Sequence, residues 1–520
     1  MATEKQVNSV KVRMYRHGFG DCFLLSFCRG KTRVFSMLID CGIKHNTKSD
    51  DVPIEDVIKD LLGTLKPVGG GKPVIDVLVA THEHWDHISF FHPTKSPNFF
   101  SQFEIRQVWL AWTENPEDEE ALRINSRLRQ GAAALKNAAR KLKNTLPKKK
   151  PQSKGMYVGE QAEADAREQF NLSLEDVLGF YGVTAITETS VTALRKTTES
   201  GIKYKDKNAT SVETAVAMEN IVELGKKGNG IKYFSPGTQV DRAWVPPGVN
   251  VFVLGPPKNA LINKSNPTRG HGHENYLGID HSGLTSFIDG ALQMDAEQTG
   301  KLQVDHSKPF GNGVGISVEA AKTKSYFQQF YFDADQHRMI ENNWLDIAGQ
   351  FALQLDGAIN NTSLVLAIEL EESGKVLLFP GDAQVGSWLS WHQHEWKVKR
   401  DSKTKTITAT DLLNNTVLYK VSHHGSHNAT VKDQGLELMT HPELVAMMPE
   451  KEKCYNGIPH PPLIKRLKQM CKGRVLVSAD VNFPPESLET DAPKELSPAE
   501  WEEFKANLVV DKLYIEYTIK

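Results

Sequence analysis

The sequence predicts an α/β fold with a discontinuous core, and three observations support this prediction. Short apolar runs, typical of buried strands, recur in both halves of the chain. A stretch with helical spacing of apolar residues, Asp51–Leu65, lies among the first of them. Two long stretches of different composition, 113–245 and 259–340, then separate the strand-rich parts. We therefore expect a core made of residues 8–112, 246–258 and 341–520, with the other two segments as insertions.

The expected strands are apolar or alternating runs bounded by glycine, and they fall into two groups. The first group is Val10–Tyr15, Cys22–Cys28, Val34–Ile39, Val74–Ala80 and Ile105–Trp112. A helix at Asn343–Leu355 is expected before most of the second group. That group is Val249–Leu254, Ser363–Leu370, Lys375–Phe379 (a hairpin with the preceding run), Val417–Ser422, Arg474–Ser478 and Leu513–Tyr517.

Composition narrows the class of protein. At 520 residues the chain exceeds one typical core, and 39% hydrophobic with 24% charged residues is typical of a globular protein. The net charge of −2 argues against a globally basic nucleic-acid binder. We expect a cytoplasmic protein without a membrane segment, because no long apolar run and no signal pattern occurs. The 5 cysteines are scattered without C-x-x-C spacing, which favours reduced thiols.

The first insertion, 113–245, is expected to be mostly helical, with helices up to Pro147 and at Leu174–Tyr181 and Val212–Leu224. Its segment 121–154 contains many Lys and Arg residues and no Asp or Glu, which favours a polyanionic substrate. The alternative is a solvated helix balanced by the acidic stretch 113–120. The candidate substrate-binding residues are Arg127, Arg140, Lys141, Lys148, Lys149 and Lys150. The second insertion, 259–340, is Gly-rich and expected to be irregular.

The most informative stretch is Thr81–His87, with the sequence THEHWDH, directly after an expected strand. Imidazole and carboxylate groups together suit zinc and other first-row divalent ions. The i, i+2 step places His82 and His84 on one side of an extended segment, whereas Asp86 and His87 can face a second metal. A polar loop without metal is the alternative, and it is disfavoured because this spacing rarely occurs by chance.

Two later strand ends carry similar residues. Asp382 follows an apolar strand and a glycine, and its two oxygens could bridge two cations. Taken alone, Gly381-Asp382 would be read as a turn. The pair His423-His424 follows another strand, and a solvated turn is again the alternative. Three strand ends with His or Asp clusters together predict a metal site.

These segments resemble the metallo-β-lactamase superfamily, and more closely its branch with the nuclease domain of the ComEC-type DNA-uptake proteins. The resemblance implies an αββα sandwich with metal ligands on loops along one edge of the paired sheets. It lies between residues 10 and 480 and covers about half of the chain. The segments that carry it are Leu38–Gly42, Thr81–His87, Phe379–Ala383 and Val421–Ser426 for the superfamily, and Gly18–Cys22, Asn361–Leu366 and His423–Ser426 for the branch.

The resemblance also implies a role for each residue. His82 and His84 would bind a first metal, and Asp382 would bridge it to a second. The second metal would be bound by Asp86, His87 and His424. Behind these ligands we expect Asp21, Asp40 and Gly42, the last for close backbone approach. His423 would be a supporting or a substrate-facing residue, although the sequence does not order the two histidines.

One departure concerns the first metal, to which the superfamily usually supplies another histidine. No histidine in a strand-loop setting fills this position, so we expect the first metal to have fewer protein ligands, to use water, or to be weakly held. The expected cofactor is Zn²⁺, as two ions, with Mn²⁺ as an alternative, and whether one or two ions bind stays open. The histidines that we expect on the surface instead are His271, His273, His281, His306 and His337.

The expected chemistry is hydrolysis. Two cations about 3.5–4 Å apart would share a hydroxide with a pKa near 7, so no Ser or Cys nucleophile is required. Asp86 would orient the hydroxide, and His423 is the other candidate catalytic residue. We expect a phosphodiesterase, and a DNA or RNA nuclease in particular, because of the basic segment.

Two alternatives remain. One is a small-molecule hydrolase that acts on a head-group or cyclic-nucleotide phosphodiester, a lactone or a thioester. The other is a non-catalytic interaction module whose insertions bind a protein partner. A separate question is posed by Trp388, Trp391 and Trp396, which fit core packing or an aromatic wall for a substrate.

Overall fold

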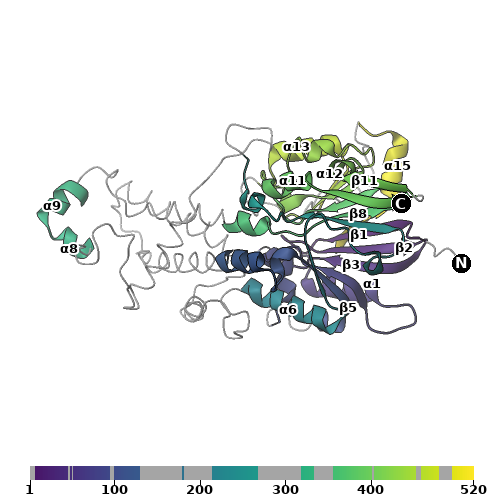
Figure 1. Cartoon of the computed structure of the whole chain (residues 1–520), viewed down its shortest axis with the longest axis horizontal. Coiled ribbons are helices and arrows are strands. Elements are labelled where there is room, and N and C mark those ends of the chain that lie inside the picture. The colour runs from purple at the N-terminus through teal and green to yellow at the C-terminus, as the bar shows by residue number, and fades with distance from the viewer. Residues whose placement is uncertain are drawn as a thin grey trace.

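The chain forms two β-sheets with helices packed against them (Figure 1). The computed structural model describes residues 6–44, 47, 49, 51–93, 99–128, 179–180, 213–267, 318–332, 355–400, 403–451, 458–478 and 495–520. The expectation of an α/β fold is confirmed. No helix within these ranges combines the length and the apolar character that a membrane span requires.

The first sheet has eight strands in the order β15-β16-β1-β2-β3-β4-β5-β6. Strands β15, β16, β1, β2 and β3 are antiparallel neighbours, whereas β3 to β6 are parallel. The last strands of the chain therefore lie beside the first. The bounds are β1 Ser9–Tyr15, β2 Phe23–Arg29, β3 Thr32–Ile39, β4 Val74–Val79, β5 Glu104–Ala111, β6 Ile231–Phe234, β15 Leu508–Val510 and β16 Tyr514–Ile519.

The second sheet has six strands in the order β14-β13-β12-β9-β8-β7. Here β7, β8 and β9 are antiparallel, and β9, β12, β13 and β14 are parallel. A separate hairpin consists of β10 (Glu395–Arg400) and β11 (Lys403–Thr408). The bounds are β7 Val249–Gly255, β8 Val365–Leu370, β9 Val376–Phe379, β12 Thr416–Lys420, β13 Val445–Met448 and β14 Val475–Val477.

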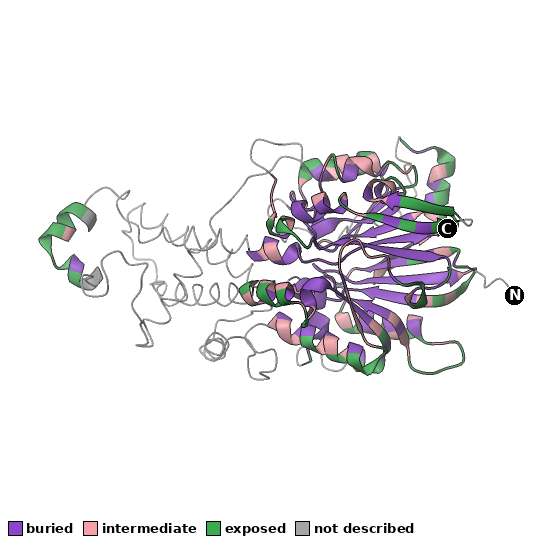
Figure 2. Cartoon of the chain, viewed as in Figure 1, coloured by how far each residue is buried: buried purple, intermediate pink, exposed green. Residues whose placement is uncertain are grey.

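One hydrophobic core is shared by the two sheets, and the two-residue period of the strands explains how. Val77 and Val79 of β4 pack in one cluster with Leu366 and Ile368 of β8. The alternate residue of β4, Leu78, belongs to a different cluster that contains helical residues. Each sheet thus has one face toward the other sheet and one face toward helices, and Figure 2 shows the strands buried throughout most of their length.

Helices cover the outer faces of both sheets (Figure 1). Helices α1 (Ile54–Leu65) and α6 (Glu213–Lys227) pack on the first sheet. Helices α11 (Val385–Trp391), α12 (Ala409–Asn414) and α13 (Pro461–Met470) pack on the second. The remaining helix near the C-terminus, α15 (Pro498–Ala506), buries Trp501 and Phe504 in the core between the sheets.

The structure differs from the sequence expectations at the insertions. Strand β6 falls within 113–245 but forms the edge of the first sheet, so the segment from 213 onward packs with the core. The four residues of β6 are too few to show the alternation of apolar and polar residues that predicts a strand. Within 259–340, the short helices α8 (Val318–Lys322) and α9 (Ser325–Phe327) and the π-helix η6 (Gln328–Phe332) occur where irregular chain was expected.

Several expected helices lie wholly or mostly outside the described residues. A helix is present over 119–128, but its expected continuation to Pro147 is not described. The same holds for most of Leu174–Tyr181 and of Asn343–Leu355. The tryptophans of α11 are described, and both Trp388 and Trp391 are fully buried in the core of the second sheet. They are core residues and not a substrate wall.

Candidate metal centre

The candidate metal ligands, and Asp40 behind them, lie in the turns that follow four strands. Asp40 follows β3, and the 82–87 motif follows β4 and includes the short helix α2 (Trp85–Ile88). Asp382 follows β9, and His424 follows β12 within the 3₁₀ turn η8 (Ser422–Gly425). Strands β3 and β4 are parallel neighbours, as are β9 and β12, so their carboxyl ends lie at the same edge of each sheet. The two edges meet at these side chains.

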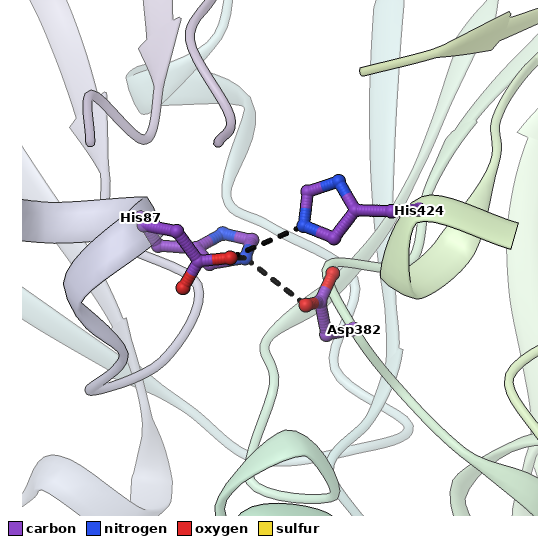
Figure 3. A group of neighbouring side chains, drawn as sticks. His87, Asp382 and His424 are labelled. Atoms are coloured by element: carbon purple, nitrogen blue, oxygen red, sulfur yellow. Dashed lines mark hydrogen bonds and ion pairs between the residues drawn. The ribbon is translucent and has the colours of Figure 1, made fainter. Parts of the chain in front are cut away.

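Four buried side chains, Asp86, His87, Asp382 and His424, form a group that could hold a metal ion, with ligand atoms all within 4.8 Å of one another. His87 Nε2 lies 3.1 Å from Asp382 Oδ2, and His424 Nε2 lies 3.1 Å from Asp86 Oδ2. In a tetrahedral site with bonds of about 2.0–2.2 Å, neighbouring ligand atoms are about 3.3–3.6 Å apart. Figure 3 shows the two rings and the carboxyl group of Asp382 directed toward one another. The distances therefore suit ligands of one ion.

Hydrogen bonds on the side away from the centre fix the orientation of the His87 and His424 rings. His87 Nδ1 donates a hydrogen bond to Asp40 Oδ2 at 2.8 Å, and His424 Nδ1 donates one to the carbonyl oxygen of Pro449 at 2.7 Å. Each ring consequently directs Nε2 at the centre. This arrangement, in which an outer acceptor holds one nitrogen and frees the other, is usual for metal-ligating histidines.

His82 and His84 form a second pair next to the first group. Thr81 Oγ1 donates to Asp40 Oδ2 at 2.7 Å, so its oxygen accepts from His82 Nδ1 at 3.0 Å. His82 Nε2 then faces His84 Nδ1 at 3.1 Å. Among the described residues this pair is not part of a group of three or more potential ligands. Among the described residues, the groups of three or more that could hold a metal are the four-ligand group and Asp21, Asp40 and His87, and the His82–His84 pair lies beside them.

Lys420, the last residue of β12, lies behind Asp382. Its ammonium group is buried, 2.6 Å from Asp21 Oδ2 and 3.1 Å from Asp382 Oδ1. Burial opposes the charged form, but the two carboxylates outweigh burial and raise the pKa of Lys420 above its usual value. The sequence analysis missed this residue. The available signal was a lysine at the end of a mostly apolar strand, three residues before the histidine pair.

Close backbone approach holds the ligand segments together. A Cβ atom on Gly42 would lie 2.5 Å from the backbone nitrogen of His87, and one on Gly20 would lie 2.6 Å from the carbonyl oxygen of Asp86. The amide of Asp21 donates to the same Asp86 oxygen at 2.9 Å. No side chain fits between these segments, which explains the two glycines.

Backbone strain is concentrated at the site. Asp40, His423 and His424 have positive φ angles of 55°, 45° and 51°. Residues other than glycine rarely adopt this region, and such residues cluster at functional sites. All three are tied to the four-ligand group: Asp40 accepts from His87, the amide of His423 donates to Asp382, and His424 is a member that lies 3.1 Å from Asp86.

The charges of the metal-free centre follow from its contacts. For His87, burial favours the neutral ring, but Asp382 and Asp21 outweigh burial and raise its pKa well above the usual value. For Asp86, burial favours the protonated form, but His87 and His424 lower its pKa to about 2. Burial lowers the pKa of His84 and His423 to about 4. In the absence of metal, His87 therefore carries a proton on the nitrogen that faces Asp382.

His423 does not join the four-ligand group. Its backbone amide donates to Asp382 Oδ1 at 3.1 Å, and its ring Nε2 lies 3.4 Å from Asn360 Nδ2. It is 8% exposed, whereas His424 is fully buried. Of the two histidines that the sequence could not order, His424 is thus the one that belongs to the group that could hold a metal ion.

The helix over 355–360 contributes a residue that the sequence analysis missed. Asp356 Oδ1 lies 3.8 Å from His84 Nε2, and Asn360 donates to Asp356 Oδ2 at 3.0 Å. Burial, with the negative charges of Asp86 and Asp382, raises the pKa of Asp356 to about 8. The expected helix ended at Leu355, so nothing in the local pattern indicated this carboxyl group.

The first insertion contacts the site at Phe180. Its ring centroid lies 5.6 Å from that of His84, and its carbonyl oxygen accepts from the Trp85 amide at 2.8 Å. Arg127 is exposed at the end of the 119–128 helix. The other candidate substrate-binding and surface residues lie outside the described residues: Arg140, Lys141, Lys148, Lys149, Lys150, His271, His273, His281, His306 and His337.

Comparison with known proteins gives no match. No protein-family model, no curated protein and no solved structure matches the chain. The function of the cluster therefore has to be inferred from its own residues.

Proposed function

We propose that this chain is a metal-dependent hydrolase of the metallo-β-lactamase type that cleaves phosphodiester bonds. The observation that carries the proposal is the buried group Asp86, His87, Asp382 and His424, whose ligand atoms lie within 4.8 Å of one another. Two paired sheets with outer helices, and ligands at one edge, are what the resemblance to that superfamily implies. This agreement supports the αββα assignment.

The donor set fits a divalent ion that accepts nitrogen and oxygen ligands, which favours Zn²⁺, with Mn²⁺ as the alternative. Asp86, His87, Asp382 and His424 would hold the more tightly bound ion. His82 and His84 would hold a second ion with fewer protein ligands. An ion bound here would polarise the scissile bond and make water nucleophilic near neutral pH.

Other residues of the chain orient the side chains of the proposed centre. Asp40 and the carbonyl group of Pro449 orient two rings, and Asp356 lies beside the outer nitrogen of His84. The ring of His423 lies beside Asn360 and its amide holds Asp382, and at 8% exposure it is less deeply buried than His424. We assign His423 to substrate contact for this reason. Asp86 would orient the attacking water.

A phosphodiester is favoured because its anionic oxygen is attracted to a cationic centre. The basic segment 121–154 supports a polymer such as DNA or RNA. The contact between Phe180 and His84 supports a second candidate, a small phosphodiester enclosed by the first insertion. These two substrate classes share the same centre and differ in the role of the basic segment.

Turnover assays test the proposal. The purified chain with Zn²⁺ or Mn²⁺ would be assayed on plasmid, single-stranded DNA, RNA and a chromogenic phosphodiester. We expect cleavage that is lost in His84→Ala and Asp382→Asn. Matched controls outside the four-ligand group, the half-buried His441→Ala and the exposed Asp433→Asn, should retain the activity. Cleavage that persists in the first two variants would contradict the proposal.

The substrate class is tested by neutralising the Lys and Arg residues of 121–154 to Gln. Loss of nucleic-acid cleavage with unchanged turnover of the chromogenic substrate would support a nuclease. Unchanged rates on both substrates would contradict a role for this segment in binding a polyanion.

A further inference from the structure

We propose that Lys420 is a positioning residue for Asp382: its ammonium group holds one carboxylate oxygen and so directs the other at the metal. This inference rests on the proposed metal centre and goes beyond it. It assigns a role to a strand residue that binds neither metal nor substrate.

The contacts of Lys420 are complete. Its Nζ lies 2.6 Å from Asp21 Oδ2, 2.9 Å from the carbonyl oxygen of Gly381 and 3.1 Å from Asp382 Oδ1. An ammonium group has three N–H donors, and each has one oxygen here. The side chain is 1% exposed, so water cannot replace these partners. A buried cation with three fixed acceptors cannot move without breaking them.

The consequence for Asp382 is that its two oxygens are not equivalent. Oδ1 accepts from Lys420 and from the amide of His423, each at 3.1 Å. Oδ2 lies 3.1 Å from His87 Nε2, within the four-ligand group. Two donors on Oδ1 prevent rotation of the carboxylate, so only Oδ2 is presented to a metal.

Lys420 also joins the two sheets at the centre. It extends from β12 of the second sheet to Asp21, which precedes β2 of the first. The amide of Asp21 in turn donates to the carbonyl oxygen of Asp86, a member of the four-ligand group. Ligands from both sheets are therefore fixed relative to one another through this lysine.

Removing Lys420 should change metal affinity in two opposite ways, one through the charge of the centre and one through the position of Asp382. Loss of the positive charge makes the centre more negative, which by itself strengthens the binding of a cation. Loss of the hydrogen bond frees Asp382 to rotate, which weakens binding. The double variant Lys420→Met/Asp21→Asn removes one positive and one negative charge, so its net charge equals that of the wild type. It removes the ion pair behind Asp382 at constant net charge. Asp21 Oδ2 also lies 3.7 Å from His87 Nδ1, so the single variant Asp21→Asn is measured alongside to account for that contact.

The experiment measures the dissociation constants of Zn²⁺ and Mn²⁺ for the metal-stripped full chain, by competition with a chromophoric chelator. We expect the double variant to bind about 10–100-fold more weakly than the wild type, the range typical of outer-shell partners of metal ligands. Equal affinity in the double variant would overturn the positioning role. Thermal unfolding of the metal-free proteins is recorded alongside.

A matched control exists elsewhere in the molecule. Arg13 is also a buried cation between two carboxylates, 2.7 Å from Glu516 and 2.5 Å from Asp60. The variant Arg13→Met/Glu516→Gln should lower the unfolding temperature but leave the metal dissociation constants unchanged. A purely structural role for Lys420 would give the same pattern in Lys420→Met/Asp21→Asn and would overturn the proposal.

Two further outcomes are informative. If the double variant does not fold, the single variant Lys420→Met decides: weaker binding supports positioning, whereas tighter binding shows a charge effect alone and overturns it. A wild-type chain that binds no metal would overturn the proposed function itself. A wild-type chain that binds metal as tightly as the double variant would overturn only the role of Lys420.

Discussion

Hydrogen bonds to neighbouring groups orient His87 and His424 for metal binding. His87 is held by Asp40 and His424 by the carbonyl group of Pro449, and both direct Nε2 at a carboxylate. In the metal-free chain these Nε2 atoms carry protons, because nearby carboxylates raise the pKa of both rings against the effect of burial. A metal ion that binds here must displace those protons.

Metal affinity should consequently depend on pH. The pKa values of His87 and His424 lie above the usual value in the metal-free protein, so protons compete with metal around neutrality. We expect affinity to rise with pH, by up to about tenfold per unit for each proton displaced, and to level off above these pKa values. Isothermal titration in buffers of different ionisation enthalpy measures the protons released. Affinity independent of pH between about pH 6 and pH 8 would contradict this expectation.

The elements around the centre contribute through close packing. Strand ends deliver the ligands, and Gly42 lets the turn after β3 contact the backbone of α2. The tryptophans of α11 fill the core beneath the loop that carries Asp382. Packing of this kind tolerates few substitutions.

Gly42→Ala should destabilise the protein, because the new Cβ would lie 2.5 Å from backbone atoms of Asp86 and His87. We expect a loss of at least about 1–3 kcal/mol in the free energy of unfolding, with weaker metal binding. Gly63→Ala in α1 is the matched control, since its Cβ would meet nothing within 4 Å. That variant should gain about 0.5–1 kcal/mol. Chemical denaturation of both variants measures the difference, and equal stabilities would refute the close approach.

Trp391→Ala tests the core assignment of α11. The side chain is fully buried and packs with Trp388 and Tyr419 in the second-sheet cluster. We expect a loss of about 3–5 kcal/mol in the free energy of unfolding. Trp244, which is only partly buried, provides a milder comparison. A substrate-wall role would instead leave stability nearly unchanged and raise the KM.

The sequence alone predicted the features that depend on a local pattern of apolar and polar residues. The strand positions follow from short apolar runs, and the 82–87 motif and His424 directly follow such runs. Lys420 and Asp356 were missed because their roles arise only when distant segments meet: Lys420 contacts Asp21, and Asp356 lies beside His84. Strand β6 was missed because pairing with β5, not its own sequence, makes it a strand.

At the scale of the whole molecule, the centre joins the two sheets. Asp86 and His87 follow a strand of the first sheet, and Asp382 and His424 follow strands of the second. The sheets share one core, and the four-ligand group lies where their edges meet. An ion held by both halves should therefore stabilise the entire fold and not only a loop.

Metal should raise the unfolding temperature of the whole protein. An ion at about 100 times its dissociation constant adds about 2.7 kcal/mol to the free energy of unfolding if it binds only the folded state. Calorimetry with saturating Zn²⁺ or Mn²⁺, and again after chelation, should show one transition that shifts as a unit. The shift should vanish in Asp382→Asn. No shift in the wild-type chain would argue against a metal that links the sheets.

The most direct test of the central claim, that Asp86, His87, Asp382 and His424 hold a metal ion, is elemental analysis of the purified chain. We predict about one or two divalent ions per chain after incubation with Zn²⁺ or Mn²⁺ and desalting. Substituting His87 and His424 together by Ala should abolish the tightly held ion, while the variant His441→Ala, outside the four-ligand group, retains it. A correctly folded wild-type chain without bound metal, or undiminished metal content in the double variant, would contradict the claim.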